Sequence, residues 1–482
     1  MKNMRLLFIP LLVMALSFSA CDDDRLLNPD PPLAITIDQA FTNAEIFQTY
    51  MNGIYDELSD GANMPRLVPW VDVRGGDALV IPTGNFSRYP IEYNFTETPN
   101  AAYGSDDQWF QAYDIIGLCN PALQALEDPD VPLTDDTKAL FEAECRAFRA
   151  LSYHNLIRIF AQPYAAGRDN LGVPLSLTPA SPTDEPLPRA TVGAVYDQMV
   201  ADLVRAEAIM PATATDIFKW TRKSIQGVLA RVYLDMGMWT EAAAMAEAAL
   251  DGVTLMTAAE YQAGFDEATS EWLLGGGITA DDNNGFVSIH SFWDTRRLGY
   301  SSLRLDMTFI DDNFTATDAR GFPLLRVDGA GAPIVSTAYI TNKWEHNTGF
   351  NQDEVYMRAS EMYLIAAEAY ARLGGANETR ANELLFAIQS RADAAAVATN
   401  ASGQALIDEV LLERRKELYA EGFRYFDLQR LQLDLERSAA GGHYANPLNI
   451  PFGDFRRLSP IPQFELDGNP NIRPQQNPGY GN

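Results

Sequence analysis

Acidic side chains are the groups in this sequence that could most readily carry out chemistry, because the chain holds 65 Asp and Glu residues. Two carboxylates that flank a glycosidic bond are the usual machinery of a glycoside hydrolase. Adjacent acids stand at Asp281-Asp282 and at Asp311-Asp312. Such pairs are expected by chance at this abundance, and they more often cap a helix or a turn. A secreted helical glycoside hydrolase is therefore an alternative that has no specific sequence signature.

Other enzyme classes find no support in the histidine and serine patterns. The four histidines are scattered and do not form the H-E-x-x-H spacing of a zinc site. The sequence also lacks a G-x-S-x-G nucleophile motif and a phosphate-binding loop. We therefore expect a protein that is not an enzyme, with no catalytic residues, no bound metal and no cofactor.

Aromatic residues gather in two long stretches that lack a helical period, residues 62–105 and 254–354. Irregular stretches of this length are uncommon in a compact domain and usually carry function. Aromatic rings can stack on the C–H faces of sugar rings, while carboxylate, amide and guanidinium groups bond hydroxyls. Trp and Tyr are also highly buried on average, so each ring taken alone is more often part of the core. The candidate ligand-binding residues are Trp70, Asp77, Tyr93 and Asn94 in the first stretch and Trp293, Arg297 and Tyr300 in the second.

The N-terminus has the pattern of a secretory signal peptide. Lys2 and Arg5 precede an apolar run from Leu6 to Leu16. This run is shorter than the ~20 residues that a membrane-spanning helix needs. We therefore expect residues 1–20 to be a signal peptide that is removed on export.

The residues around Cys21 resemble a lipobox, where a signal peptidase cuts before a cysteine that becomes lipid-modified. Phe18 departs from the leucine that is usual in that motif, and an ordinary cleavage site is the alternative. The three Asp residues at 22–24 are similar to the export signal of surface lipoproteins in Bacteroidota. We predict lipidation of Cys21, palmitate included, with residues 21–33 as lipid anchor and linker.

The charge of the chain restricts its partners. The formal net charge is -29, and it becomes -31 when the two positive charges of Lys2 and Arg5 leave with the signal peptide. So acidic a protein repels nucleic acid and anionic polymers, which favours a neutral ligand. A general adaptation for solubility is the alternative explanation.

Amphipathic helical patterns dominate the rest of the chain. Trp109 and Trp239 stand at helix-packing positions and are excluded as ligand contacts. Cys119 and Cys145 also fall in helical patterns and are predicted to be buried free thiols, although a disulfide between them stays open. The predicted helical stretches are residues 38–58, 106–126, 140–160, 192–210, 224–250, 356–373, 380–396 and 404–418.

Residues 224–250 match the tetratricopeptide pattern, a repeat of two packed helices. Such repeats bury their apolar faces only against neighbours, so they stack. A structural repeat scaffold that binds proteins is therefore a third class of function. The matching residues are Ala230, Tyr233, Gly237, Trp239, Ala242 and Ala249, and a second copy begins at Ala367, Tyr370 and Gly374.

The C-terminal third carries a set of ordered motifs. Residues 413–418 read ERRKEL, 421–430 read EGFRYFDLQR, 458–462 read LSPIP and 476–480 read QNPGY. Further blocks follow the same order upstream, at residues 143–150, 172–175, 189–203 and 358–369. Together these motifs resemble the SusD/RagB family over nearly the whole mature chain.

This resemblance implies an all-α, SusD-like fold, in which a tetratricopeptide-like bundle of helical hairpins carries long irregular loop insertions. We expect an N-terminal SusD-like region at residues 34–258 and a C-terminal SusD/RagB region at residues 259–482. The resemblance also implies a lipoprotein at the surface of the outer membrane that binds a glycan or, as in some relatives, a peptide. Its implied partner is a SusC-like TonB-dependent outer-membrane transporter, which would receive the ligand.

The charged residues of the ERRKEL and EGFRYFDLQR motifs are expected to be structural. Arg414, Arg415, Arg424 and Arg430 can bond carboxylates with both arms of the guanidinium group. Arg and Glu on adjoining helix turns most often form ion pairs. Gly422 is expected to end the preceding helix.

Overall fold

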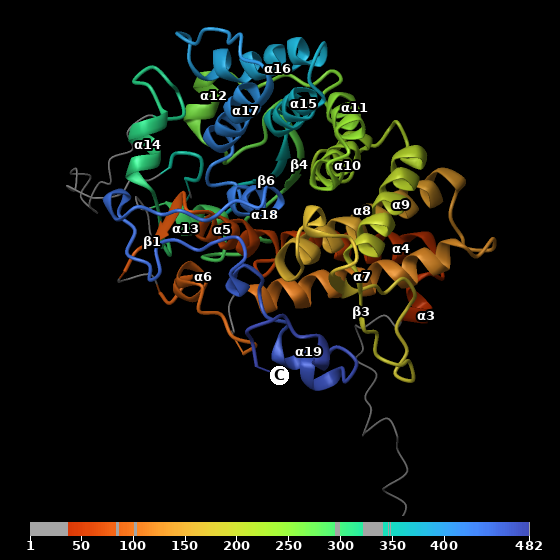
Figure 1. Ribbon diagram of the computed structural model, residues 1–482. Coiled ribbons are helices and arrows are strands. Elements are labelled where there is room, and N and C mark those ends of the chain that lie inside the picture. Colours follow the sequence, from red (N-terminus) through yellow and green to blue (C-terminus); the bar gives the residue numbers. More distant parts are fainter. Residues whose placement is uncertain are drawn as a thin grey trace, which may run out of the picture.

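Helices make up most of the structure (Figure 1). The computed structural model describes residues 37–82, 86–100, 104–294, 299–321, 341–345, 347 and 349–481. Within these residues the strands form three two-stranded antiparallel sheets. The predicted mainly helical fold class is therefore confirmed, with small sheets added to it.

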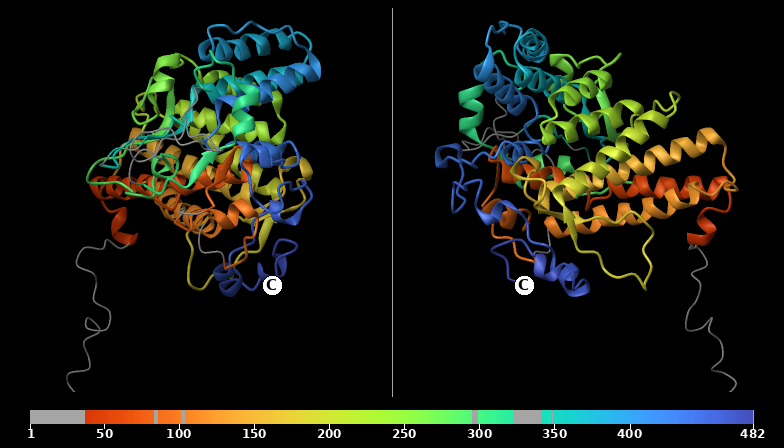
Figure 2. Two further views of the ribbon diagram at one scale, coloured as in Figure 1. Left: turned by 90° about the vertical axis from the view of Figure 1, so that its left-hand side faces the viewer. Right: turned by 45° about the vertical axis from the view of Figure 1, so that its right-hand side comes forward.

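Long helices of the N-terminal half lie side by side, as Figure 1 and the right-hand view of Figure 2 show. Asn43 and Thr134 cap two of them, because their side-chain oxygens accept hydrogen bonds from backbone N–H groups of the first turn. Cys119 and Cys145 are buried free thiols between these helices, as predicted. The helices are α3 (Ile37–Ala40), α4 (Ala44–Ser59), α7 (Ser105–Leu126), α8 (Asp135–Phe160) and α9 (Val192–Ile209).

Helical hairpins follow in the middle and upper parts of the molecule (Figure 1). Gly237 ends the first helix of one hairpin with a φ of 71°, a left-handed conformation that glycine adopts without strain. The buried alanines Ala242 and Ala246 let α11 approach α15 closely. This packing is compatible with the tetratricopeptide prediction. The helices are α10 (Arg222–Met236), α11 (Trp239–Ala249), α15 (Ala359–Leu373), α16 (Asn377–Ala392) and α17 (Gly403–Glu417).

The prediction that residues 62–105 are irregular is wrong in part. This stretch contains α5 (Met64–Gly75), β1 (Ala78–Val80) and α6 (Pro90–Asn94). Pro69 inside α5 hides the helix in the sequence, because proline in a helix interior normally ends or kinks the helix. Burial overrides that preference, since α5 packs against α18 (Arg424–Arg430) and almost all its residues are buried.

Residues 254–354 also contain regular structure. The strand β1 pairs with β5, and β4 pairs with β6. The first of these pairs joins the proposed regions 34–258 and 259–482, and that division stays a proposal. The elements are α12 (Ala258–Ala263), β4 (Trp272–Gly276), α13 (Ile289–Trp293), β5 (Leu303–Leu305), α14 (Met307–Asn313) and β6 (Glu354–Arg358).

The C-terminal segment returns to the N-terminal half. Ser459 N–H donates to the carbonyl of Ile159 at 3.1 Å, and the Arg189 guanidinium donates to the Gln475 carbonyl at 2.8 Å. In the part of the chain that the structure describes, no helix combines the length and apolarity needed to cross a membrane. The remaining elements are β2 (Leu171–Pro174), β3 (Arg189–Thr191), η1 (Tyr164–Ala166), η2 (Ala439–Gly441), η3 (Phe455–Arg457), α19 (Gln463–Gly468) and η4 (Arg473–Gln475).

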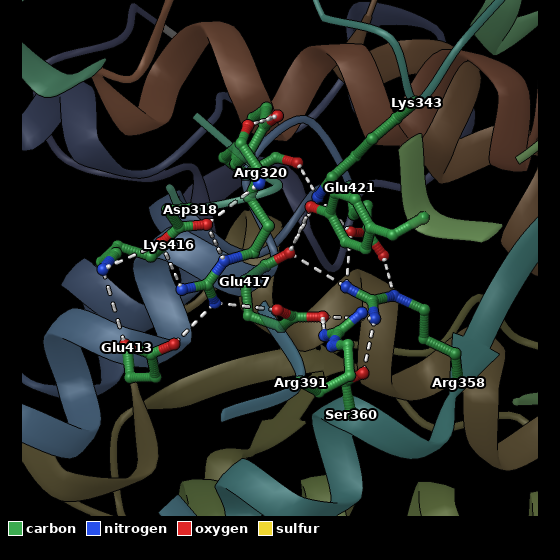
Figure 3. A network of polar contacts seen from close by, with 12 residues as sticks. Asp318, Arg320, Lys343, Arg358, Ser360, Arg391, Glu413, Lys416, Glu417 and Glu421 are labelled. Carbon is green, nitrogen blue, oxygen red and sulfur yellow. Dashed lines mark hydrogen bonds and ion pairs between the residues drawn. The ribbon is translucent and has the colours of Figure 1, made fainter. Parts of the chain in front are cut away.

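The ERRKEL motif and Glu421 build a buried network of charges (Figure 3). Arg358 of β6 donates to Glu271, Glu417 and Glu421, each at 2.7 Å. Burial lowers the pKa of Lys343 to about 8, although Glu421 opposes this shift. Burial alone would raise the pKa of Glu417, but several surrounding guanidinium groups hold it well below its usual range. The network ties α17 to β6 and to residues 341–345.

The structural role predicted for the motif arginines is confirmed for three of them. Arg414 pairs with Asp427, Arg415 with Asp77, and Arg430 with Glu368. The expectation that Gly422 ends the preceding helix is wrong, because α17 ends at Glu417. Gly422 has a φ of 79°, and a Cβ there would lie 3.1 Å from the Cα of Val68. Glycine therefore stands at this position because α5 passes so closely.

Candidate functional site

Four aromatic side chains gather at the surface near the loops that carry the predicted ligand-binding residues. We call Phe86, Phe286, Tyr300 and Phe350 the aromatic surface. The ring centroids of Phe86 and Tyr300, and those of Tyr300 and Phe286, lie 5.8 Å apart, and Phe286 lies 5.1 Å from Phe350. Phe86 is 64% exposed and Phe286 is 40% exposed. Exposed large apolar rings in one cluster indicate a binding surface.

A buried layer of rings supports the aromatic surface from below. Phe292 of α13 stacks on Tyr300 with centroids 5.3 Å apart and an interplanar angle of 20°. Tyr89 packs edge-on against Phe292 at 5.2 Å. Because Phe292 and Tyr89 have almost no exposed surface, they fix the position of Tyr300. The position of Tyr300 in the aromatic surface is therefore fixed by packing against buried rings.

The guanidinium group of Arg88 adds a polar group to the aromatic surface. Its carbon lies 4.4 Å from the centroid of the Tyr300 ring, and its Nη2 donates to the Tyr300 hydroxyl at 2.7 Å. Stacking of this kind keeps the planar cation beside the rings. A guanidinium group in that position can donate hydrogen bonds to ligand hydroxyls while the rings contact apolar faces.

Backbone strain concentrates around the same surface. Among the described residues, eight residues other than glycine have positive φ. Four of these eight, Phe86, Ser87, Ser301 and Phe350, belong to the aromatic surface or stand next to it in the chain, and a fifth, Tyr89, belongs to the buried layer of rings below it. Such conformations cost about 1–3 kcal/mol each and cluster at ligand-binding sites. The strain is consistent with loops that are shaped to present rings outward.

Three predicted ligand-binding rings lie in the core instead of at the surface. Trp70, Tyr93 and Trp293 have exposed fractions of 0%. The Trp70 indole N–H donates to Glu97 at 3.1 Å, and the Tyr93 hydroxyl bonds His443 Nδ1 at 2.8 Å. A buried ring has no free face for a ligand, so a contact role for these three would require them to become exposed.

The polar residues predicted to bind ligand are engaged within the protein wherever the structure describes them. Asp77 is buried and accepts a hydrogen bond from Arg415 Nε at 2.8 Å, and Asn94 is half-buried and donates to the Pro90 carbonyl at 2.7 Å. Arg297 and Cys21 lie outside the described residues. Tyr300 is thus the predicted residue that the structure places in the aromatic surface.

Sequence reasoning missed Phe86, Phe286, Phe350 and Arg88 as candidate residues. Each of these phenylalanines follows a turn-forming pair or residue in the sequence: Gly84-Asn85, Asn284-Gly285 and Gly349, respectively. Glycine and asparagine favour tight turns at the surface, where a following ring is presented to solvent. A search for aromatic residues directly after such turns could have found these three.

Comparisons with known proteins relate the chain to one family. The model of the SusD family matches residues 334–480. A second model, described as starch-binding associating with outer membrane, matches residues 39–234. SusD-like protein P2 of Formosa agariphila is 25% identical, and the alignment covers 100% of both chains.

Solved structures agree with these matches. A putative sugar binding protein from Bacteroides vulgatus is 26% identical, with a TM-score of 0.81 over 92% of this chain and 100% of that chain. A SusD superfamily protein from Bacteroides thetaiotaomicron is 26% identical, with a TM-score of 0.79 and the same coverage. A laminarin binding SusD-like protein is 25% identical, with a TM-score of 0.72 over 91% of this chain and 100% of that chain. The fold, the ordered motifs and these similarities together show that the chain belongs to the SusD/RagB family.

Proposed function

We propose that this protein is a cell-surface lipoprotein that captures a neutral oligo- or polysaccharide and delivers it, uncleaved, to a partner TonB-dependent outer-membrane transporter. The observation that carries the proposal is the aromatic surface of Phe86, Phe286, Tyr300 and Phe350. Phe86 and Phe286 are its exposed rings, and their apolar surface suits the C–H faces of sugar units. The laminarin binding relative has the same fold and supports a glycan as the ligand class.

The polar groups near the rings support a ligand rich in hydroxyls. Arg88 provides donors, and Arg297, three residues before Tyr300 in the chain, is proposed to contribute further donors to the same surface. The mature charge of -31, two units below the -29 of the full sequence, opposes acidic polymers. A neutral glycan is therefore favoured, and a peptide ligand is the alternative within the same uptake role.

Binding to a panel of neutral polysaccharides, laminarin and starch included, tests this proposal. Phe86→Ala and Phe286→Ala are expected to weaken binding about 3- to 10-fold each, because each removes one exposed ring. The matched control is Phe110→Ala on α7, a phenylalanine that is 58% exposed and lies outside the aromatic surface. Equal loss of affinity in the control, or no binding of any polysaccharide by the unmodified protein, would refute the proposal.

The absence of cleavage is tested with the same ligands. We expect no release of reducing ends from a bound polysaccharide on prolonged incubation. Asp281, Asp282, Asp311 and Asp312 are exposed, in a loop and at the end of α14. If the unmodified protein does release reducing ends, and substitution of one of these acids abolishes the release, the glycoside hydrolase would be favoured instead.

The outer-membrane location and the transporter partner belong to this proposal as well. The family model that matches residues 39–234 is described as associating with outer membrane. Lipidation at Cys21 would supply the anchor, because several acyl chains on one residue bind a bilayer durably. Co-purification of a TonB-dependent transporter with the tagged protein from native membranes tests the partnership, and recovery of the protein alone after mild detergent extraction and cross-linking would speak against it.

A further inference from the structure

An open groove is lined in part by Asp282 and Asp353, which stand close in the chain to Phe286 and Phe350 of the aromatic surface. Its volume is about 590 Å³, which is within the usual range for ligand sites. Its walls come from α4, from residues 218–219 and from the end of β4, together with Asp282 and Asp353. We call it the α4–β4 groove.

The groove and the aromatic surface share two loops. Asp282 of the groove stands four residues before Phe286, and Asp353 stands three residues after Phe350. The corresponding Cα atoms are thus separated by at most about 14 Å and about 11 Å. The Asn284 amide donates to the Ser59 carbonyl at 2.6 Å, which fixes the first loop to the end of α4. These separations place part of the groove lining within a few sugar lengths of Phe286 and Phe350.

The lining of the groove combines an aromatic wall with hydrogen-bonding groups. The half-buried Phe218 ring packs against Gly277, where a Cβ would lie 3.2 Å from the ring. Asn52 of α4 and Lys219 provide donors, and the carboxylates provide acceptors. The Asp353 Oδ1 accepts a hydrogen bond from the Ile278 N–H at 3.2 Å, which holds this carboxylate in the wall of the groove. A flat ring next to mixed donors and acceptors matches the chemistry of a sugar.

The charge of the groove narrows the class of ligand. Asp56, Asp282 and Asp353 line it, with Lys219 as the cationic side chain among its lining residues. Burial and then the neighbouring Asp282 raise the pKa of Asp56, which shows that these carboxylates already repel one another. A sulfated or uronic polymer would add to this repulsion, whereas a neutral chain would not.

We propose that the α4–β4 groove is a second binding segment for the same neutral glycan chain that stacks on the aromatic surface. This inference rests on the proposed function, because it assigns the groove to the same ligand. Its consequence is a dependence on chain length. Short oligomers fill the aromatic surface, and longer oligomers gain affinity by entering the groove.

Calorimetric titration of neutral oligomers of increasing length tests the groove in the full-length protein. The series is prepared from the first neutral polysaccharide that the unmodified protein binds. Phe218→Ala removes the aromatic wall, and Asn52→Trp fills the groove from an exposed position on α4. Both are expected to weaken the longest oligomers about 3- to 10-fold and to leave the shortest that bind unchanged. Phe286→Ala is expected to weaken all lengths.

The matched control is Gln124→Trp on α7, which replaces an exposed glutamine outside the groove lining. It is expected to bind every oligomer as the unmodified protein does, and thermal melting checks that each variant is folded. If Phe218→Ala and Asn52→Trp bind the longest oligomers with unchanged affinity, the groove is not a binding segment, while the proposed function remains intact. Absence of binding by the unmodified protein to every neutral polymer would overturn both.

Discussion

At the level of single residues, exposure separates the aromatic side chains into two groups with different roles. Trp70 and Trp293 have exposed fractions of 0%, whereas Phe86 is 64% exposed. Buried rings stabilise the fold through their apolar area, while exposed rings contribute little to stability and remain available to a ligand. The two groups are distinguished by measuring stability and binding on the same variants.

Trp70→Ala is expected to lower the free energy of unfolding by about 3–5 kcal/mol, because it leaves a large cavity next to Tyr425 and removes the donor to Glu97. Phe86→Ala is the matched comparison, expected to change this free energy by less than about 0.5 kcal/mol and to weaken glycan binding. Chemical denaturation and titration calorimetry measure the two effects. A stable Trp70→Ala protein that has lost its ligand would instead restore Trp70 as a contact residue.

Arg358→Met is expected to destabilise the protein by about 3–5 kcal/mol, since it leaves Glu271, Glu417 and Glu421 buried without their shared cation. Denaturant titration provides the measurement. Arg473→Met serves as control, because Arg473 pairs with Asp467 at 3.4 Å in an exposed position. Exposed pairs contribute about 0–1 kcal/mol. A similar loss in both variants would show that burial of the network does not matter.

At the level of elements, β6 and α13 connect the core to the aromatic surface. Glu354 begins β6, is fully buried, and accepts a hydrogen bond from the Ile289 N–H at the start of α13 at 3.2 Å. The hydroxyl of Tyr356 donates to its other oxygen at 3.3 Å. Burial raises the pKa of Glu354 to about 7, although both hydrogen bonds oppose the shift. This carboxylate therefore ties β6 to the start of α13, the helix that carries Phe292.

The raised pKa of Glu354 predicts a pH dependence of stability. Its ordinary value is 4.5 and its folded value about 7, so the folded state holds the proton more tightly than the unfolded chain. The stabilisation is complete below pH 4.5 and is lost as the pH rises through 7. Glu354→Gln, which keeps an acceptor for Ile289, is expected to be more stable than the unmodified protein at pH 8 by roughly 1–3 kcal/mol.

Denaturation of the two proteins at pH 5 and pH 8 measures this difference, which should shrink toward pH 5. The comparison with Asp454→Asn controls for general effects of removing a carboxylate, because the pKa of Asp454 is lowered, mainly by its hydrogen bond with Arg456. That variant should not gain stability at high pH. An advantage of Glu354→Gln that is equal at both pH values would contradict the assignment of the titration to Glu354.

At the level of the whole molecule, the two halves of the chain are interlocked. The C-terminal segment bonds to α8 and β3, and β5 pairs with β1. In Figure 1, α19 lies at the lower end of the molecule and the α15–α17 helices lie at the upper end. None of the described helices is long and apolar enough to span a membrane.

Cys21→Ser is expected to move the protein from the membrane fraction to the soluble exported fraction, because it removes the predicted site of acylation. Fractionation and detection of the protein in each fraction measure this change. Ser19→Ala, which keeps a small residue before Cys21, is the control and should remain in the membrane fraction. Membrane retention of the Cys21→Ser protein would exclude lipidation of Cys21 as its anchor.

Local patterns in the sequence determined the helices and the structural role of the family motifs. The 3.6-residue period of α8 and α15 is set by neighbours in the chain, so it can be read without the fold. Arg414 and Arg430 were predicted as ion-pair partners because Arg and Glu on adjoining helix turns often pair, although their partners, Asp427 and Glu368, lie on other helices. The helix α5 escaped prediction because its partner, α18, lies about 350 residues away.

The tertiary structure alone decided which aromatic rings face solvent. Trp70 and Phe86 stand in the same stretch and look alike in the sequence, but Trp70 packs against Tyr425 of α18 and is buried, whereas Phe86 is exposed. Exposure depends on what distant segments cover, which no local pattern records. The aromatic surface likewise joins residues 86, 286, 300 and 350, and the α4–β4 groove joins α4 to β4. The sequence by itself thus determined a family and a set of helices, and the fold decided which aromatic rings are exposed.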